Sequence, residues 1–104
     1  MLNNYILVGR IVEDIEIKEI EGKKVGILKV SVPRSFKNTE GNYDADIIDL
    51  EVYDNIAENV SNYCKKGDVV GAKGRISKLE GEELKLVVDK VTFLSSKKNE
   101  EDDF

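Results

Sequence analysis

The stretch DIIDLEVYDNIAENVSNYCKKG, residues 46–67, changes its hydrophobic period halfway along. In the first half apolar and polar side chains alternate, so that Ile48, Leu50 and Val52 share one face of an extended chain. In the second half the apolar residues recur at helical spacing, at Ile56, Val60, Tyr63 and Cys64. The stretch therefore predicts a strand that runs directly into an amphipathic helix.

Both ends of the predicted helix carry recognisable signals. Asp54 or Asn55 can cap the first turn, because a side-chain oxygen there accepts a hydrogen bond from a free backbone N–H. Lys65 and Lys66 stand where the helix dipole favours cations, and Gly67 then supplies a C-terminal stop.

Strand patterns lie on both sides of this stretch. They occupy residues 4–12 with a continuation over 16–20, then 25–33, 68–79 and 84–94. The first pattern is long enough to bend and serve two sheets. The segments EGKK (21–24) and EGEE (80–83) predict tight turns. Pro33 ends its strand or leaves it at an edge, and the polar segment 34–44 is expected to be a long, mobile loop.

The order of these elements predicts the fold. Three strands are followed by one helix and two more strands. In a chain of 104 residues without an internal repeat, this order predicts an all-β fold, a five-stranded OB-fold barrel with one helix between strands 3 and 4. We expect the domain to cover residues 1–94, followed by a short acidic tail over residues 95–104.

Composition favours a globular protein of the cytosol. Hydrophobic residues make up 40% of the chain and charged residues 36%, and no apolar run approaches the ~20 residues of a membrane helix. The one cysteine excludes an internal disulfide framework and suits a reducing compartment. The net charge of −5 argues against nucleic-acid binding unless a local basic patch exists.

Few residues could carry catalysis. The chain has no histidine, so the usual general base near neutral pH and the commonest zinc ligand are both missing. Cys64 falls on the apolar stripe of the predicted helix, where packing explains it better than nucleophilic chemistry. The carboxylates Asp44, Asp46 and Asp49 lack the spacing of a calcium loop and are better explained as a solvated face. Three glycines lie inside predicted strands, where they indicate bulges or bends: Gly9, Gly71 and Gly74. We therefore expect no enzymatic activity, no metal site and no cofactor.

Binding is the better-supported class of function. Tyr53 and Ile47 lie on the polar face of the third strand, where an exposed ring can stack on a base. In the segment RSFK, Phe36 stands among cations that could neutralise phosphates. The candidate phosphate contacts are Arg10, Arg34, Lys37, Lys73, Arg75 and Lys78. Asp49 and Glu51 stand beside Tyr53 and would repel phosphate. These patterns alone leave nucleic-acid binding and a protein-binding or structural module equally open.

The same segments resemble the bacterial single-stranded DNA-binding proteins (SSBs). MLNNYILVGRIVED resembles the opening of that family, and VPRSFKN is similar to the segment that leads into its long loop. ADIIDLEVYDNIAENVSNYCKKG resembles the third strand and the helix, while VVGAKGRI and VTFL are similar to the last two strands. The resemblance covers almost all of residues 1–94 in family order.

The resemblance implies an OB-fold that binds single-stranded DNA without catalysing a reaction. It implies action in DNA replication, repair and recombination, in the cytoplasm and on the nucleoid. Such proteins are normally homotetramers. Here the first strand, Leu2 to Val8, would form dimers by edge pairing, and dimers would pack into tetramers. Phe36 and Tyr53 would stack on bases.

Two positions depart from the family pattern. Ile47, which belongs to the expected DNA-binding set, stands where the family usually has an aromatic residue, and Leu79 stands near the usual aromatic of a hairpin. The loss of two stacking platforms should weaken DNA binding. The rival function is therefore an OB-fold adaptor for protein interactions, with weak or no affinity for DNA.

The tail SSKKNEEDDF, residues 95–104, combines an acidic run with an aromatic ring. In the family that it resembles, an acidic tip docks on replication and repair proteins. The expected partner-binding tip is Asp102, Asp103 and Phe104, although the family's Ile-Pro before the final ring is missing. A solubilising tail would explain the carboxylates but not the ring.

Overall fold

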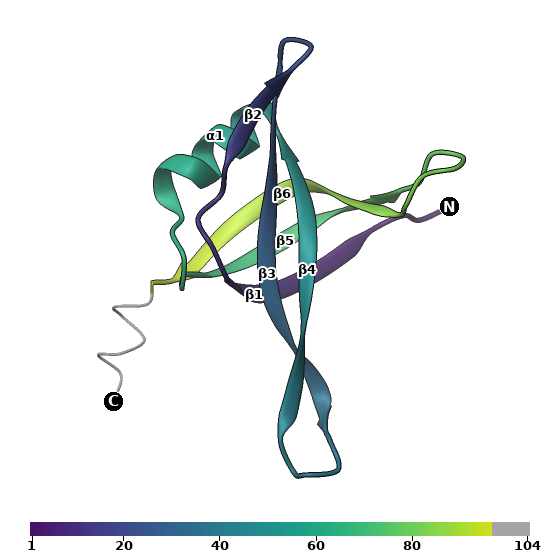
Figure 1. Cartoon of the computed structure of the whole chain (residues 1–104), viewed down its shortest axis with the longest axis vertical. Helices are drawn as coiled ribbons and strands as arrows, with labels where there is room; N and C mark the ends of the chain where they lie inside the picture. The colour runs from purple at the N-terminus through teal and green to yellow at the C-terminus, as the bar shows by residue number, and fades with distance from the viewer. Residues whose placement is uncertain (97–104) are drawn as a thin grey trace.

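The computed structural model describes residues 1–96, which contain six strands and one helix (Figure 1). In chain order they are β1 (Tyr5–Ile11), β2 (Ile17–Ile20), β3 (Lys23–Lys37), β4 (Tyr43–Tyr53), α1 (Asp54–Tyr63), β5 (Val69–Ser77) and β6 (Lys85–Ser95).

Five of these strands close into a barrel. The strand order is β1-β5-β6-β4-β3-β2, and β1 closes the sheet by pairing with β3 as well as with β5. The closing pairs are Arg10 with Ser31 and Ile11 with Val30. Helix α1 connects β4 to β5, the third and fourth strands of the barrel. The predicted five-stranded barrel with one helix between strands 3 and 4 is thus confirmed.

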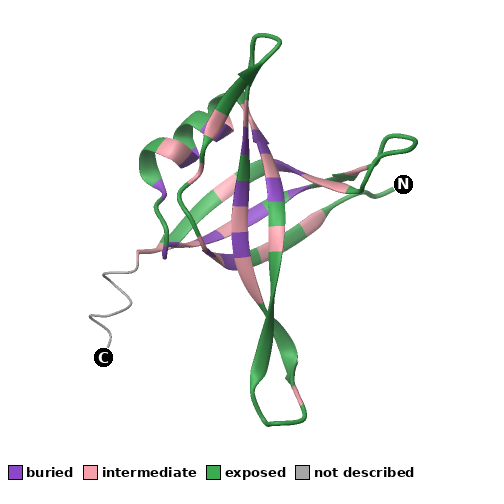
Figure 2. Ribbon diagram, in the orientation of Figure 1, coloured by how far each residue is buried: buried purple, intermediate pink, exposed green. Residues whose placement is uncertain are grey.

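The barrel is filled by the alternating residues that the sequence pattern singled out. Its largest fully buried side chains are Leu28, Leu50, Val30, Val52 and Val70. Helix α1 packs against β2, β3, β4 and β6 and contributes Ala57 and Val60 to the same core. Cys64 is also buried there, as its place on the apolar stripe predicted. Figure 2 shows the buried positions concentrated along the middle of the strands.

The N-terminal strand is not continuous, contrary to the sequence pattern. β1 ends at Ile11, and β2 forms a separate hairpin with β3. The turn that was predicted at EGKK joins these two strands, with Ile20 paired to Lys23. Glu21 and Gly22 both have positive φ, 51° and 80°, which is the backbone that a two-residue hairpin of this twist needs.

The prediction of a mobile loop over residues 34–44 is wrong. β3 extends to Lys37, and β4 starts at its partner Tyr43, so that the two strands form a long hairpin that projects from the barrel (Figure 1). The side-chain oxygen of Asn38 accepts hydrogen bonds from the backbone N–H groups of Glu40 and Asn42 and holds the turn. The strands are exposed on both faces here, so no alternation of apolar residues marks them in the sequence (Figure 2).

Pro33 lies within β3, where it pairs with Ala45 of β4. The pairing of β3 with β1 stops at Ser31, so β3 has β4 as its sole strand neighbour at Pro33 within residues 1–96. This is the edge position that the sequence allowed for the proline.

The expected helix caps are wrong in detail. The residue at the N-cap is Tyr53, and no side chain caps the first turn. Asp54 instead has φ of 48°, and its carboxylate accepts a 3.4 Å hydrogen bond from the Lys24 backbone. The helix ends at Tyr63, so Lys65 lies beyond its last turn, but Nζ of Lys65 donates a 3.5 Å hydrogen bond to the Ser61 carbonyl in that turn. Gly67, with φ of 94°, belongs to the following turn.

Gly74 marks a bulge between β5 and β6, as its position inside a strand suggested. A Cβ atom at Gly74 would lie 1.8 Å from the backbone oxygen of Val87 and 2.9 Å from the ring of Tyr5. The same atom at Gly71 would have no neighbour closer than 3.8 Å. The barrel therefore needs glycine at the first position and not at the second.

Replacing Gly74 with alanine should lower the free energy of unfolding by about 3 kcal/mol, the upper end of overpacking costs, because backbone must move to admit the methyl group. Gly71→Ala, on the same strand, is the matched control and should cost much less. Urea unfolding followed by circular dichroism measures both, and equal losses would contradict this account of the bulge.

The hydroxyl of Tyr5 is buried beside this bulge without a hydrogen-bond partner among the described residues. Burial, and then the charge of Asp89, raises the pKa of Tyr5 to about 12. The raised pKa means that the folded protein holds the neutral phenol. Ionisation of Tyr5 therefore costs the folded protein no stability below the unfolded pKa of about 10, and stability is lost as pH rises through about 12.

Tyr5→Phe should raise the free energy of unfolding by about 1 kcal/mol at neutral pH, because it removes a buried polar group that lacks a partner. Between pH 10 and 12 the variant should also lose less stability than the parent protein. Urea unfolding at pH 7 and at several alkaline pH values tests both statements, and a loss of stability in the Tyr5→Phe variant at pH 7 would refute the first.

Candidate nucleic-acid interface

The outward side of β4 carries the side chains that the sequence pattern assigned to its polar face. Leu50 and Val52 point into the barrel, and the residues between and beside them point outward. The residues of β3 that pair with these outward residues of β4 lie on the same outward side. The pairs are Ile47 with Ser31, Asp49 with Lys29, Glu51 with Ile27 and Tyr53 with Val25. This surface, continued on β5 and β6 by Arg75 and Val87, is called the outer face below.

The pairing of β6 with both β5 and β4 brings Arg75 to Tyr53. Arg75 of β5 is registered with Val87 of β6, and Val87 is registered with Glu51 of β4, so one row crosses from β5 to β4. Beside this row lies a hollow of about 280 Å³, lined by Lys23, Tyr53, Asp54, Arg75, Val87 and Val88. The hollow combines one aromatic ring, two cations, one carboxylate and two apolar side chains.

The ring of Tyr53 is held in position by its neighbour on the same strand. Its hydroxyl donates a 2.6 Å hydrogen bond to a carboxylate oxygen of Glu51. This hydrogen bond, with burial, raises the pKa of Tyr53 to about 12. The phenol therefore stays neutral at physiological pH, and one carboxylate oxygen of Glu51 accepts its hydrogen bond.

The β3–β4 hairpin carries a second group of rings. Phe36 is 62% exposed, and Ile47 at the base of the hairpin is 58% exposed. Lys37 places its Nζ 5.8 Å from the centre of the Tyr43 ring, a cation–π distance. Sequence reasoning missed Tyr43, because its pairing with Lys37 becomes visible only when residues 34–44 are recognised as a hairpin.

Several predicted phosphate contacts already have partners in the structure. Arg34 donates to Asp46, with 2.9 Å between Nη2 and Oδ1. Arg75 donates to Asp89 at 2.5 Å. Arg10 donates to the backbone oxygen of Gly67 at 2.8 Å. Sequence reasoning missed these pairs because the partners lie on other strands or far along the chain.

The remaining predicted cations lie on and after β5. Lys73 is an exposed residue of β5, paired in register with Lys90 of β6, which sequence reasoning did not single out. Lys78 follows the end of β5. Neither Lys73 nor Lys78 has an ion-pair partner within residues 1–96. Arg10 is also on the outward side, in one row with Ser31 and Ile47.

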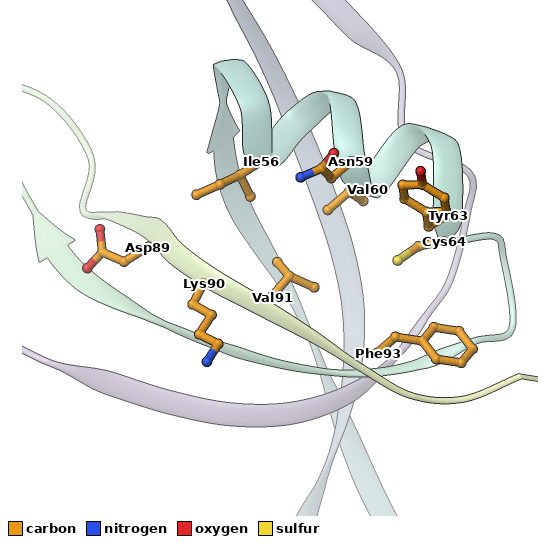
Figure 3. Close-up of a pocket in the computed structure, with 9 residues that line it drawn as sticks. All are labelled: Ile56, Asn59, Val60, Tyr63, Cys64, Asp89, Lys90, Val91 and Phe93. Carbon is orange, nitrogen blue, oxygen red and sulfur yellow. The ribbon is translucent and has the colours of Figure 1, made fainter.

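A different hollow, an apolar groove of about 450 Å³, lies between α1 and β6 (Figure 3). Ile56, Val60 and Tyr63 of the helix face Val91 and Phe93 of the strand across it (Figure 3). The thiol of Cys64 also lines the groove, and burial raises its pKa, so it lacks the thiolate character of a nucleophile. None of the predicted DNA-binding residues lines this groove.

Other expectations concern metals, membranes and the tail. Within residues 1–96 no three potential ligands gather closely enough to hold a metal ion. No helix in that range is long and apolar enough to cross a membrane. The predicted tip, Asp102, Asp103 and Phe104, lies outside the described residues.

Proteins of similar sequence fall in one family. The model of the single-strand binding protein family matches residues 2–94. Single-stranded DNA-binding protein 2 of Staphylococcus aureus (strain COL) is 38% identical over 108 residues, 95% of this chain and 78% of its own length. The single-stranded DNA-binding protein of Oceanobacillus iheyensis is 39% identical over 106 residues, 93% of this chain and 66% of its own length.

Solved structures agree on the fold. The SSB domain of a Synechococcus protein has a TM-score of 0.70 at 18% identity, covering 88% of this chain and 96% of that one. The second SSB of Mycobacterium smegmatis has a TM-score of 0.70 at 17% identity, with 89% of each chain covered. The chain therefore belongs to the single-strand binding protein family, a family of binding proteins rather than enzymes.

Proposed function

We propose that the chain binds single-stranded DNA on the outer face and along the β3–β4 hairpin. The observation that carries this proposal is the hollow beside Tyr53, where an aromatic ring lies next to Arg75 and Lys23. A ring offers a stacking surface to any base, and neighbouring cations neutralise the phosphates on either side of that base. Family membership and the names of the similar proteins support the same ligand.

The strand would run from the hollow to the hairpin. Tyr53 and Ile47 are six residues apart on β4, which corresponds to about 20 Å of strand at ~3.3 Å per residue. Phe36 and Tyr43 then provide rings on the hairpin itself. Ile47 offers apolar contact without stacking, so we expect weaker binding than an aromatic residue there would give.

The acidic residues of β4 oppose DNA less than their number suggests. Asp49 lies 3.6 Å from the ammonium group of Lys29, and Glu51 accepts the hydroxyl of Tyr53. Each carboxylate therefore has a donor beside it that reduces its effect on an approaching phosphate. The overall charge of −5 is compatible with binding because these local partners decide the field at the outer face.

Family membership supports a role in DNA replication, repair and recombination, with the C-terminal tip Asp102, Asp103 and Phe104 recruiting partner proteins.

A homo-oligomer, a tetramer or a dimer, would form through β1. From Tyr5 to Gly9 this strand pairs with β5 and not with β3, which leaves one edge open. Ile6 on this strand is 76% exposed, an apolar side chain that a second copy would cover.

The adaptor function stays the second candidate, because the groove between α1 and β6 is apolar and carries the exposed ring of Tyr63. Such a groove suits a protein segment better than a charged backbone. An adaptor with no DNA affinity would use this groove and leave the outer face unoccupied.

Tyr53→Ala and Phe36→Ala should each weaken binding of fluorescently labelled poly(dT) by about 5- to 150-fold, the equivalent of ~1–3 kcal/mol per stacked base. Tyr63→Ala is the matched control, since it removes an exposed ring from the helix side. Fluorescence anisotropy titrations at several salt concentrations give the dissociation constants.

The titrations separate the two candidates. DNA binding through the outer face predicts saturable binding that weakens steeply with salt and that is unchanged in the Tyr63→Ala variant. Absence of binding by the parent protein at low salt would exclude the proposal and favour the adaptor. Binding that survives loss of both Tyr53 and Phe36 would show that the outer face is not the site.

A further inference from the structure

Two arginines of the proposed interface are held by carboxylates, and one of them, Arg34, is held in a geometry that phosphate also uses. Arg34 directs both Nε and Nη2 at Asp46, with Nε 3.3 Å from each carboxylate oxygen and Nη2 2.9 Å from Oδ1. Such a fork of parallel N–H donors binds carboxylate and phosphate alike. The hydrogen bond from Arg34 also lowers the pKa of Asp46, so the carboxylate is ionised at neutral pH.

The second pair depends on the bulge in β6. Lys73 is registered with Lys90, and Gly74 is registered with Val88, so Asp89 is the additional residue between them. From this position Asp89 accepts a 2.5 Å hydrogen bond from Nη1 of Arg75. Arg75 in turn lines the hollow beside Tyr53. The bulge thus supplies a carboxylate to the arginine that lies nearest the proposed stacking ring.

We propose that Asp46 and Asp89 are built-in competitors of DNA phosphate, which hold Arg34 and Arg75 in place and are displaced when the strand binds. This inference rests on the proposed function, and it states that two acidic residues control the affinity of the protein for single-stranded DNA. Both pairs are about half exposed, with side-chain accessibilities of 43–54%. Ion pairs this exposed stabilise a fold little, so an arriving phosphate can replace the carboxylate without loss of structure.

The competition has a measurable consequence for binding. An arginine that exchanges its carboxylate for a phosphate leaves that carboxylate without its partner. It therefore neutralises less net charge in the complex than a cation that was previously surrounded by solvent. The protein should therefore show lower affinity and a shallower dependence of log K on log [salt] than its number of surface cations would give. Lys73 and Lys78 have no ion-pair partner within residues 1–96, so they can attract the strand before the arginines exchange partners.

The test compares Asp46→Asn and Asp89→Asn with the parent protein in poly(dT) titrations at several salt concentrations. Each substitution should tighten binding about three- to tenfold at low salt and steepen the slope of log K against log [salt] by about 0.7, the value for one more neutralised phosphate on a single strand. Glu58→Gln is the matched control. It removes the same charge from an ion pair, that of Glu58 with Lys24, which joins α1 to β3.

A double-mutant cycle separates displacement from a general change in charge. In an Arg34→Gln background, Asp46→Asn should change binding no more than Glu58→Gln does, because the arginine that it would release is absent. Unchanged or weaker binding by both Asn variants in the parent background would overturn the inference while leaving the proposed function intact. A gain of equal size in Glu58→Gln would overturn it as well. Absence of binding by the parent protein and every variant would overturn the proposed function and the inference together.

Discussion

Closure of the barrel through β1 is the constraint on which the other features of this structure depend. β1 pairs with β5 along its length and with β3 at its end, and these contacts bend the sheet around Leu28, Leu50 and Val70. Close approach of the strands requires small residues. A Cβ atom at Gly9 would lie 2.9 Å from the Ser31 oxygen, and one at Gly74 would overlap the Val87 oxygen. The closed barrel also includes the direct pairing of β6 with β4, which places Arg75 of β5 in a hollow shared with Tyr53.

The two sides of the barrel differ in chemistry in a way that suits two kinds of contact. The outer face and the hairpin combine rings with cations that are balanced by nearby carboxylates. The groove between α1 and β6 is lined mainly by apolar side chains, among them Ile56, Val91 and Phe93. Because α1 covers one part of the barrel and leaves the outer face of β4 uncovered, the same core supports both surfaces without either one obstructing the other (Figure 1).

Charge in this protein has to be assessed locally. A net charge of −5 would suggest repulsion of nucleic acid, yet several carboxylates of the proposed interface are engaged by Lys29, Arg34, Arg75 or the hydroxyl of Tyr53. Such contacts place cations and anions side by side at distances well below the Debye length, so the field that a phosphate meets depends on which partner an arginine holds. Affinity can then be adjusted by single carboxylates instead of by the total charge.

The sequence by itself determined the barrel and its inward and outward faces. Period-two alternation in β4 and the helical period of α1 arise from burial of one side of each element, and burial leaves a direct trace in the order of apolar residues. Ile47 and Tyr53 could therefore be assigned to the outward side of β4 without coordinates, where Ile47 is exposed and Tyr53 is partly buried. Phe36 is exposed, but it lies on β3 and not in the predicted loop. The extension of β3 and β4 into a hairpin could not, because strands that are exposed on both faces carry no such alternation. Only the tertiary structure decided which partners the charged residues have, since Asp89 reaches Arg75 through a bulge and Arg10 reaches the Gly67 carbonyl across 57 residues of chain. Those contacts depend on strand register and on barrel closure, which bring together residues that no local pattern relates.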